Sequence, residues 1–150
     1  GLGSMRDERL NRMWQNNKVR FLRPTRCDAD EEDEVDWFNL FALHQNRDVG
    51  RGAKNCVKEE MIPTWMDMVV WGHEHECKIE LQESLIGTYR ISQPGSSVAT
   101  SLSPGECERK SVGILDIREK QFRLNSIPLT QVRSFVMSDI SLSNPQNEED

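Results

Sequence analysis

Residues 66–75 read MDMVVWGHEH, and this stretch decides the fold class. Its first part, MDMVVW (66–71), is rich in branched and aromatic apolar residues, which is typical of a strand buried in a parallel sheet. The run stops abruptly at GHEH (72–75). Open α/β sheets bind their ligands in the loops beyond the carboxyl ends of such strands. We therefore expect a buried strand that ends at a binding site.

A second apolar run, WFNLFAL (37–43), has the same character and ends as abruptly, at His44-Gln45-Asn46. Its continuous apolar composition predicts a strand buried on both faces. The chain has only three histidines, and each of them follows one of these two strands. A single histidine at the end of a strand more often has a structural role, whereas three histidines at such positions favour a binding site.

The spacing of His73 and His75 indicates a metal site. In an extended segment, side chains at i and i+2 project the same way, so both imidazoles would face one small volume. Gly72 would let the backbone turn in close to that volume. Neutral imidazole is the commonest protein metal ligand and suits manganese, iron or zinc. The alternative is that GHEH forms an exposed polar turn. The presence of His44 after a separate strand disfavours this alternative.

The sequence also allows a second kind of metal site, a mononuclear zinc site. Cys77 lies two positions beyond His75 and would supply a fourth ligand to a mononuclear zinc. Against this reading, no second cysteine lies near His44 in the sequence. The nearest carboxylates, Glu74 and Glu76, fall on the opposite face of the alternation, and we interpret them as surface groups or neighbours of the ligands.

The rest of the chain predicts one α/β unit with a run of strands. An amphipathic helix is expected over 6–14 and a short helix near Pro63. Residues 27–36 form an acidic loop, and the polar end at 143–150 is a disordered linker, leaving 1–142 as the folded part. Further strands are expected at 18–22, 78–82, 88–92, 111–117, 121–127 and 132–142. These elements suggest a mixed sheet layered on a second sheet.

Charge and cysteine content bound the class of protein. The net charge is −6, but residues 28–36 hold seven acids and 148–150 three more, so the remainder has 15 acids against 19 bases, about +4. A mildly basic body is compatible with phosphate binding. Four cysteines without a CxxC pair predict reduced thiols in the cytosol or nucleus. No apolar run is long enough to predict a membrane span.

Four segments closely resemble one family: GLGSMRDERL (1–10), WFNLFALHQNR (37–47), WGHEHEC (71–77) and ISQPGSSVATSLSPGE (91–106). The chain is similar to the eukaryotic SbcD-type nucleases, the meiotic recombination eleven subunit of the MRN complex, within the calcineurin-like phosphoesterases. The resemblance implies the four-layer α/β/β/α sandwich of that superfamily, of which this chain would be the second half. It also implies that the opening residues are native rather than a cloning scar.

The resemblance implies a two-manganese site. His44 and His73 would bind one Mn²⁺ and His75 the other, with Gln45 and Asn46 flanking the site. The reaction would be two-metal hydrolysis of DNA phosphodiesters, as exonuclease and endonuclease. The family's loop beside the metals would here be formed by Gln93, Gly95 and Ser96, although a plain β-turn is the alternative there.

The same resemblance implies that this chain holds only part of the site. The family's upstream Asp-x-His, Gly-Asp and Gly-Asn-His motifs do not occur in the sequence, so we expect the chain alone to be inactive. Residues 48–60 also differ from the family's usual sequence. The family further implies a nuclear location, and as partners DNA, a Rad-fifty-type ATPase, a nibrin-type subunit and a second copy in a homodimer. Alternatives are another calcineurin-like phosphatase, or a non-catalytic module that binds zinc or a partner.

Overall fold

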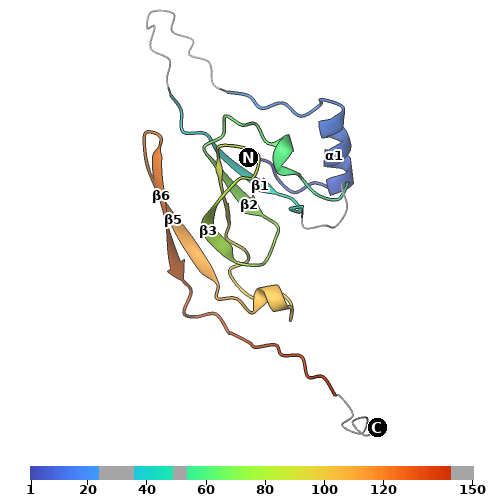
Figure 1. Cartoon of the computed structure of the whole chain (residues 1–150), viewed down its shortest axis with the longest axis vertical. Coiled ribbons are helices and arrows are strands. Elements are labelled where there is room, and N and C mark those ends of the chain that lie inside the picture. The colour runs from blue at the N-terminus through green and yellow to red at the C-terminus, as the bar shows by residue number, and fades with distance from the viewer. Residues whose placement is uncertain (24–35, 49–53, 143–150) are drawn as a thin grey trace, which may run out of the picture.

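A four-stranded mixed sheet forms the centre of the molecule (Figure 1). The computed structural model describes residues 1–23, 36–48 and 54–142. The strand order is β1-β2-β4-β3, in which β1, β2 and β4 run parallel and β3 runs antiparallel to β4. The mixed α/β sheet expected from the sequence is therefore confirmed. The strands are β1 (Leu40–His44), β2 (Met68–Gly72), β3 (Lys78–Glu83) and β4 (Arg90–Gln93).

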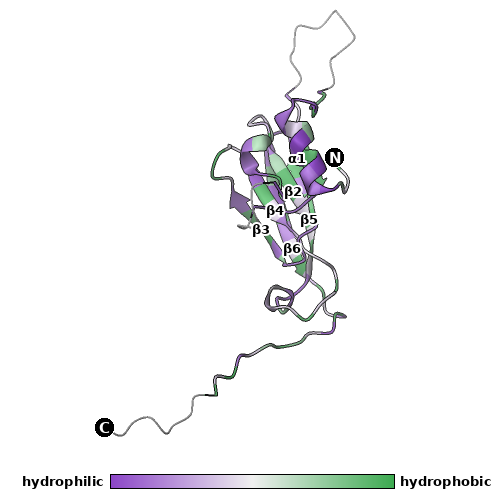
Figure 2. Ribbon diagram, turned by 90° about the vertical axis from the view of Figure 1, so that its right-hand side faces the viewer, coloured by the Kyte–Doolittle hydropathy of each residue, from purple (hydrophilic) through white to green (hydrophobic). Residues whose placement is uncertain are grey.

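The second sheet is an antiparallel hairpin of β5 (Ser111–Arg118) and β6 (Gln121–Pro128). It lies against β3, where Ile79 and Leu124 both pack close to Gly113 (Figure 2). An added Cβ at Gly113 would lie 2.8 Å from the end of the Leu124 side chain, so a larger residue there would require Leu124 to move. The layering of one sheet on a second, as the sequence predicts, is confirmed.

Helix α1 (Asp7–Gln15) covers the other side of the sheet together with the 3₁₀ turn η1 (Glu59–Met61) (Figure 1). The helix was expected at 6–14, and its apolar stripe buries Leu10 almost completely. The short turn ends before Pro63, as predicted. A second 3₁₀ turn, η2 (Pro104–Glu106), precedes the hairpin. The core consists of Leu10, Phe41, Leu43, Val57, Ile62, Met66, Val69, Trp71, Tyr89 and Ile91.

The prediction that 37–43 is buried on both faces is wrong. The strand begins only at Leu40, and its residues alternate between exposed and buried. Phe41 and Leu43 face the core, whereas Leu40 is 46% exposed and His44 lies on the same open face. An apolar run therefore does not by itself distinguish a strand covered on both faces from one covered on a single face.

Two predicted strands do not form. Over 18–22 the chain is extended, and Val19 and Phe21 pack against the core, but the segment joins no sheet. The alternation of apolar and polar residues in this segment reflects packing of one face against the core, without hydrogen bonds to a neighbouring strand among the described residues. Residues 132–142 are likewise not a strand; they run out along the surface and leave the body of the molecule (Figure 1). The acidic loop, apart from Asp36, and the tail 143–150 lie outside the described residues.

No helix in the part of the chain that the structure describes is both long and apolar enough to cross a bilayer.

Candidate metal centre

The carboxyl ends of β1 and β2 bring two histidines together. In the parallel register, His44 is paired with Gly72, so the residue after Gly72 emerges beside His44. The Nδ1 atom of His73 lies 3.1 Å from Nε2 of His44. The two ring centroids are 4.9 Å apart with planes inclined at 75°. The two ring nitrogens therefore face each other at hydrogen-bond distance.

The backbone at the end of β2 is adapted to this contact. A Cβ at Gly72 would lie 3.1 Å from the Leu43 carbonyl oxygen and 3.2 Å from Nδ1 of His44, so a side chain there would crowd the imidazole of His44. His73 itself has φ +79°, in the left-handed region that residues with a side chain rarely occupy. Such a conformation persists only where its surroundings favour it, and it is frequent at functional sites.

The distance between the two imidazole nitrogens fits a shared metal ion. Two nitrogens bound to one ion at about 2.0–2.1 Å and at right angles to each other lie about 3 Å apart. The observed 3.1 Å between His44 and His73 matches that spacing. Both side chains are exposed, so an ion can reach them.

His73 and His75 border the same pocket, as the spacing of GHEH predicts, but His75 does not join the close contact between His44 and His73. The strand ends at Gly72, and the left-handed residue His73 breaks its alternation. Nδ1 of His75 lies 2.6 Å from the Thr100 hydroxyl and 3.4 Å from a carboxylate oxygen of Glu106. Among the described residues, no three His, Cys, Asp or Glu side chains gather around one ion position. We call the His44–His73 pair and His75 the two candidate half-sites.

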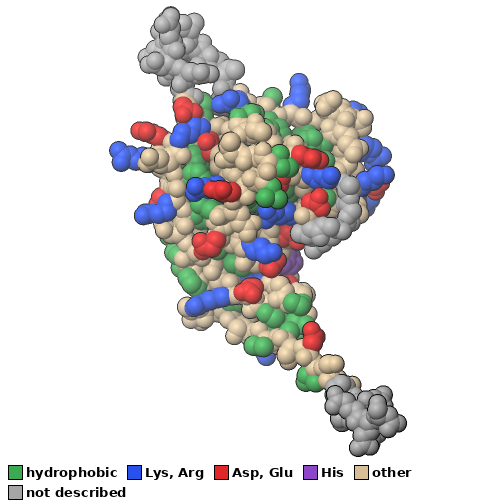
Figure 3. All heavy atoms as spheres, viewed as in Figure 1, with side chains coloured by type: hydrophobic (Ala, Val, Ile, Leu, Met, Phe, Trp, Pro, Cys, Tyr) green, Lys and Arg blue, Asp and Glu red, His purple; other side chains and the backbone are tan. Residues whose placement is uncertain are grey.

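One histidine of each half-site, His73 and His75, borders a single pocket of about 410 Å³. The Glu74 carboxylate accepts a hydrogen bond from the Arg47 backbone N–H at 2.9 Å, and Glu76 forms an ion pair with Lys78 at 2.7 Å. All three histidines are exposed, and one small histidine patch is visible on the face drawn in Figure 3, next to acidic and basic side chains. The residues around the pocket are Asn46, His73, Glu74, His75, Glu76, Ser101, Ser103, Gly105 and Glu106.

Gln45 and Asn46 connect the histidine strand to the beginning of the chain rather than to the pocket alone. Gln45 is buried; its side chain accepts a bond from the Met5 N–H at 2.7 Å and donates to the Met5 carbonyl and to Asp7. Asn46 donates to the same Asp7 carboxylate at 2.8 Å and also borders the pocket. The Trp71 indole N–H donates to the Gln45 carbonyl at 2.8 Å, which joins β2 to this arrangement.

The loop after β4 lies against the backbone of the second half-site. Gly95 has φ +73°, and a Cβ there would meet the His75 carbonyl oxygen at 2.7 Å. The Ser96 N–H donates to the same oxygen at 3.2 Å. Gln93 is buried and donates to the Glu76 carbonyl at 3.1 Å. Residues 93–96 therefore support the His75 segment through its main chain, and Gly95 is required for the close approach.

Sequence reasoning missed two buried charges beneath His75, namely Glu106 and Lys110. Hydrogen bonds to Glu106, first from the Thr100 backbone N–H and then from the side chains of Ser101, Thr100 and His75, hold the pKa of this carboxyl far below its usual range despite its burial. Glu106 closes the segment ISQPGSSVATSLSPGE, which was the only sequence signal pointing to it.

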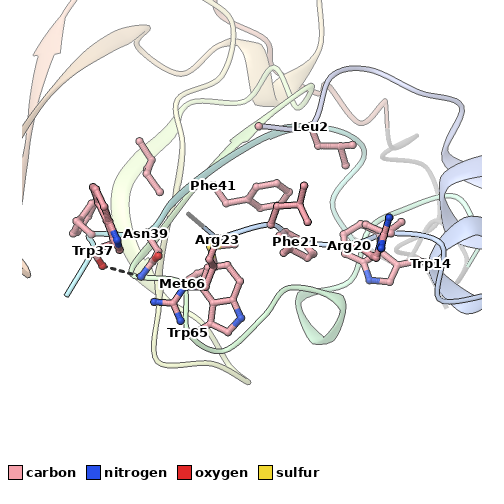
Figure 4. Close-up of a pocket in the computed structure, with 15 residues that line it drawn as sticks. Leu2, Trp14, Arg20, Phe21, Arg23, Trp37, Asn39, Phe41, Trp65 and Met66 are labelled. Atoms are coloured by element: carbon pink, nitrogen blue, oxygen red, sulfur yellow. Dashed lines mark hydrogen bonds between the residues drawn. The ribbon is translucent and has the colours of Figure 1, made fainter. Parts of the chain in front are cut away.

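A larger pocket of about 460 Å³ lies elsewhere and contains none of the histidines (Figure 4). Aromatic and arginine side chains line it, and the Arg23 guanidinium stacks 4.9 Å from the Trp65 ring centroid. It lies at the amino end of β1, near Leu40, whereas the histidines follow the carboxyl ends. Its lining contains no His, Asp or Glu among the residues that the structure describes, so we place the candidate chemistry at the histidine pocket.

Comparison with known proteins finds relatives over almost the whole chain. The chain is 51% identical over 144 residues to the double-strand break repair protein MRE11 of Homo sapiens, which covers 96% of the chain and 19% of the relative. It is 49% identical over 146 residues to MRE11 of Arabidopsis thaliana, covering 96% of the chain and 20% of the relative. No family model matches the chain.

A fungal relative agrees with these two. The double-strand break repair protein mus-23 of Neurospora crassa is 46% identical over 144 residues, covering 96% of the chain and 18% of the relative. The chain thus spans about a fifth of the length of the curated relatives it matches. These matches imply the calcineurin-like phosphoesterase fold that was expected from the sequence, and the mixed sheet agrees with it.

Proposed function

Because this chain belongs to the MRE11 family of double-strand break repair proteins, we propose that it forms one side of a two-metal nuclease centre. The proposed reaction is manganese-dependent hydrolysis of DNA phosphodiesters, as exonuclease and endonuclease. The observation that carries the proposal is the 3.1 Å contact between His44 and His73 at the carboxyl ends of two parallel strands.

Each histidine has a distinct part in this proposal. His44 and His73 would hold one Mn²⁺ between Nε2 and Nδ1, and His75 would bind the second ion through Nε2, because its Nδ1 is engaged by Thr100. When bound, a manganese pair supplies a polarised phosphate, an activated water and stabilisation of the leaving oxygen. Gly72 and Gly95 keep the two half-sites open by leaving room for the imidazole of His44 and the backbone of His75.

We further propose that the remaining metal ligands come from outside these 150 residues, so that this chain does not cleave DNA by itself. Two observations support this: the described residues bring no three ligands together, and the curated relatives are about five times longer. In the whole protein we expect DNA, a Rad-fifty-type ATPase, a nibrin-type subunit and a second copy as partners, and a nuclear location. The names of the relatives as double-strand break repair proteins support a role in DNA repair, and the protein partners rest on the family resemblance of the sequence alone.

The proposal is tested by Mn²⁺ titration of the purified 150-residue chain, followed by NMR. Mn²⁺ should broaden the ring signals of His44 and His73, and His73→Ala should weaken binding about tenfold or more. Glu80→Gln, an exposed change on β3, is the matched control and should leave binding unchanged. A lack of selective broadening at the histidines would overturn the metal site.

A DNA cleavage assay tests the second part of the proposal. The chain should give no Mn²⁺-dependent cleavage of linear double-stranded DNA. Cleavage that His73→Ala abolishes would show that the chain is sufficient and would contradict the proposed need for outside ligands. The zinc alternative is addressed in the same preparation: one tightly bound Zn²⁺ that protects Cys77 from alkylation would favour it. Within the described residues, Cys77 joins no group of three ligands with the histidines.

A further inference from the structure

Two opposite charges are buried next to His75, on Glu106 and Lys110, and Glu106 also borders the histidine pocket. The side chains of Glu106 and Lys110 are only 3% and 2% exposed, and their charged atoms are 3.5 Å apart. Burying a charge is costly unless partners compensate for it, and a well-packed apolar pair would often serve stability as well. Stability alone therefore does not explain why Glu106 and Lys110 are buried here.

Lys110 holds the main chain of His75. Its Nζ donates to the His75 carbonyl oxygen at 2.8 Å and to the Ser96 hydroxyl at 3.1 Å. The Ser96 N–H donates to the same carbonyl at 3.2 Å. The peptide group of His75 is thus fixed from two directions.

Glu106 holds the side chain of His75 through a threonine hydroxyl. Thr100 Oγ1 lies 2.9 Å from Oε1 of Glu106 and 2.6 Å from Nδ1 of His75. An ionised carboxylate can only accept hydrogen bonds, and donation to a charged acceptor is the stronger kind. The Thr100 hydroxyl therefore donates to Glu106, which leaves its lone pairs facing His75.

This direction of donation decides which ring nitrogen of His75 carries the proton. A hydroxyl whose hydrogen points at Glu106 can only accept at His75, so Nδ1 of His75 must be the N–H donor. The Glu106 carboxylate also lies 3.4 Å from Nδ1, where an unprotonated nitrogen would face a negative charge. Nε2 then keeps its lone pair. Metal-binding histidines in general donate their second ring N–H to such a partner, which fixes the tautomer.

We propose that Thr100 and Glu106 are positioning residues that hold His75 as its Nδ1–H tautomer, with Nε2 presented to the pocket as a metal ligand. The metal-binding part of this inference rests on the proposed function, whereas the tautomer can be measured without metal. His44 and His73 are arranged differently, since they direct Nε2 and Nδ1 at each other.

The experiment uses the ¹⁵N-labelled 150-residue chain at neutral pH without metal. Long-range ¹H–¹⁵N spectra of the imidazole rings distinguish Nδ1–H from Nε2–H, and with three histidines the signals can be assigned by single substitutions. We expect the Nδ1–H form to predominate at His75. Thr100→Val, which removes only the hydroxyl, should lower its share below half, and Thr100→Ser should restore it.

Thr88→Val is the matched control, because its hydroxyl donates to the Thr64 carbonyl at 3.1 Å, remote from His75, and it should change nothing. A predominant Nε2–H form in the unsubstituted chain would overturn the proposal without any variant being needed. So would an unchanged tautomer in a folded Thr100→Val chain.

Addition of Mn²⁺ then separates this inference from the proposed function. In Thr100→Val, the Mn²⁺ concentration that half-broadens the His75 signal should rise about tenfold, while the signals of His44 and His73 respond as before. If the tautomer depends on Thr100 but Mn²⁺ affects no histidine, the positioning stands and the proposed metal site fails. If all three histidines respond to Mn²⁺ and the tautomer does not depend on Thr100, the positioning fails and the metal site stands.

Discussion

Nε2 of His44 lies 3.1 Å from Nδ1 of His73, although 29 positions separate the two residues in the sequence. The parallel register of β1 and β2 produces this contact, since it places His44 opposite the residue that precedes His73. The contact between His44 and His73 is thus a product of the sheet and not of the local GHEH sequence. Changes that disturb the ends of these strands should affect metal binding before they affect the fold.

Gly72→Ala tests this dependence. The new Cβ would lie 3.2 Å from Nδ1 of His44 and 3.1 Å from the Leu43 carbonyl, so we expect the His44 ring to shift by a few tenths of an ångström from its contact with His73. We expect Mn²⁺ affinity to fall about tenfold with a loss of stability of only about 1 kcal/mol. Isothermal titration and urea unfolding measure the two quantities. Gly3→Ala is the control, because no heavy atom lies within 4 Å of its added Cβ. Equal affinities of the two variants would argue against the dependence.

Gly95→Ala should destabilise the chain more strongly. Gly95 has φ +73°, and an added Cβ would lie 2.7–2.8 Å from backbone atoms of His75 and Glu76, which cannot move aside as a side chain can. We expect a loss of about 2 kcal/mol or more in the free energy of unfolding. Gly105→Ala is the comparison, since its Cβ would touch only the side chain of Glu76 at 3.4 Å or more. A urea series that ranked the two variants equally would contradict the required close approach.

The parts of the fold that the sequence predicted are those governed by local pattern. The strand MDMVVW, the amphipathic helix and the β5–β6 hairpin follow from periodicity and turns, and they form within a few residues of the expected bounds. The segments 18–22 and 132–142 have the same composition but form no strand. A strand requires a hydrogen-bonded neighbour, and whether one is available is decided far away in the chain.

In the candidate site, too, features set by local sequence were predictable and features set by distant contacts were not. The three histidines were identifiable because each follows a strand, whereas the pairing of His44 with His73 depends on register, and the separation of His75 on one left-handed residue. Gln45 was expected beside the metals but is buried against Met5, because its amide matches the backbone N–H and C=O there. Glu106 had no local signal for its role, since its partners come from three-dimensional packing.

Gln45→Ala should detach the opening segment from the sheet. The Gln45 side chain is 1% exposed and makes three hydrogen bonds to Met5 and Asp7, which the alanine would leave unsatisfied. We expect a loss of about 2–3 kcal/mol in the free energy of unfolding. Amide hydrogen exchange should accelerate at Leu2, whose N–H donates to the Ala42 carbonyl. Asn16→Ala, which removes one exposed hydrogen bond, should change little. Unchanged exchange at Leu2 would show that Gln45 does not hold the segment.

The Asp67–Lys120 contact should make stability depend on pH in acid. It joins the turn of the β5–β6 hairpin to the start of β2, with Lys120 Nζ 2.9 Å from Asp67 Oδ2. Burial raises the pKa of Asp67, but hydrogen bonds from the Asn39 backbone N–H, from Lys120 and from the Asn39 side chain outweigh burial and lower it below 3.8. A carboxyl whose pKa is lower in the folded state stabilises the fold above its unfolded pKa, and this contribution is lost as pH falls through the folded pKa.

Asp67→Asn should therefore cost about 1 kcal/mol at pH 7, a modest value because Lys120 is 36% exposed and solvent screens the pair. The difference between the variant and the unsubstituted chain should shrink below about pH 4 and approach zero once Asp67 is protonated in the folded state. Urea unfolding at a series of pH values measures it. Asp116→Asn provides the control, since Asp116 pairs with Arg123 on the exposed face of the hairpin and should contribute little at any pH. A pH-independent difference for Asp67→Asn would mean that its charge does not stabilise the fold and that only the shape of its hydrogen bonds matters.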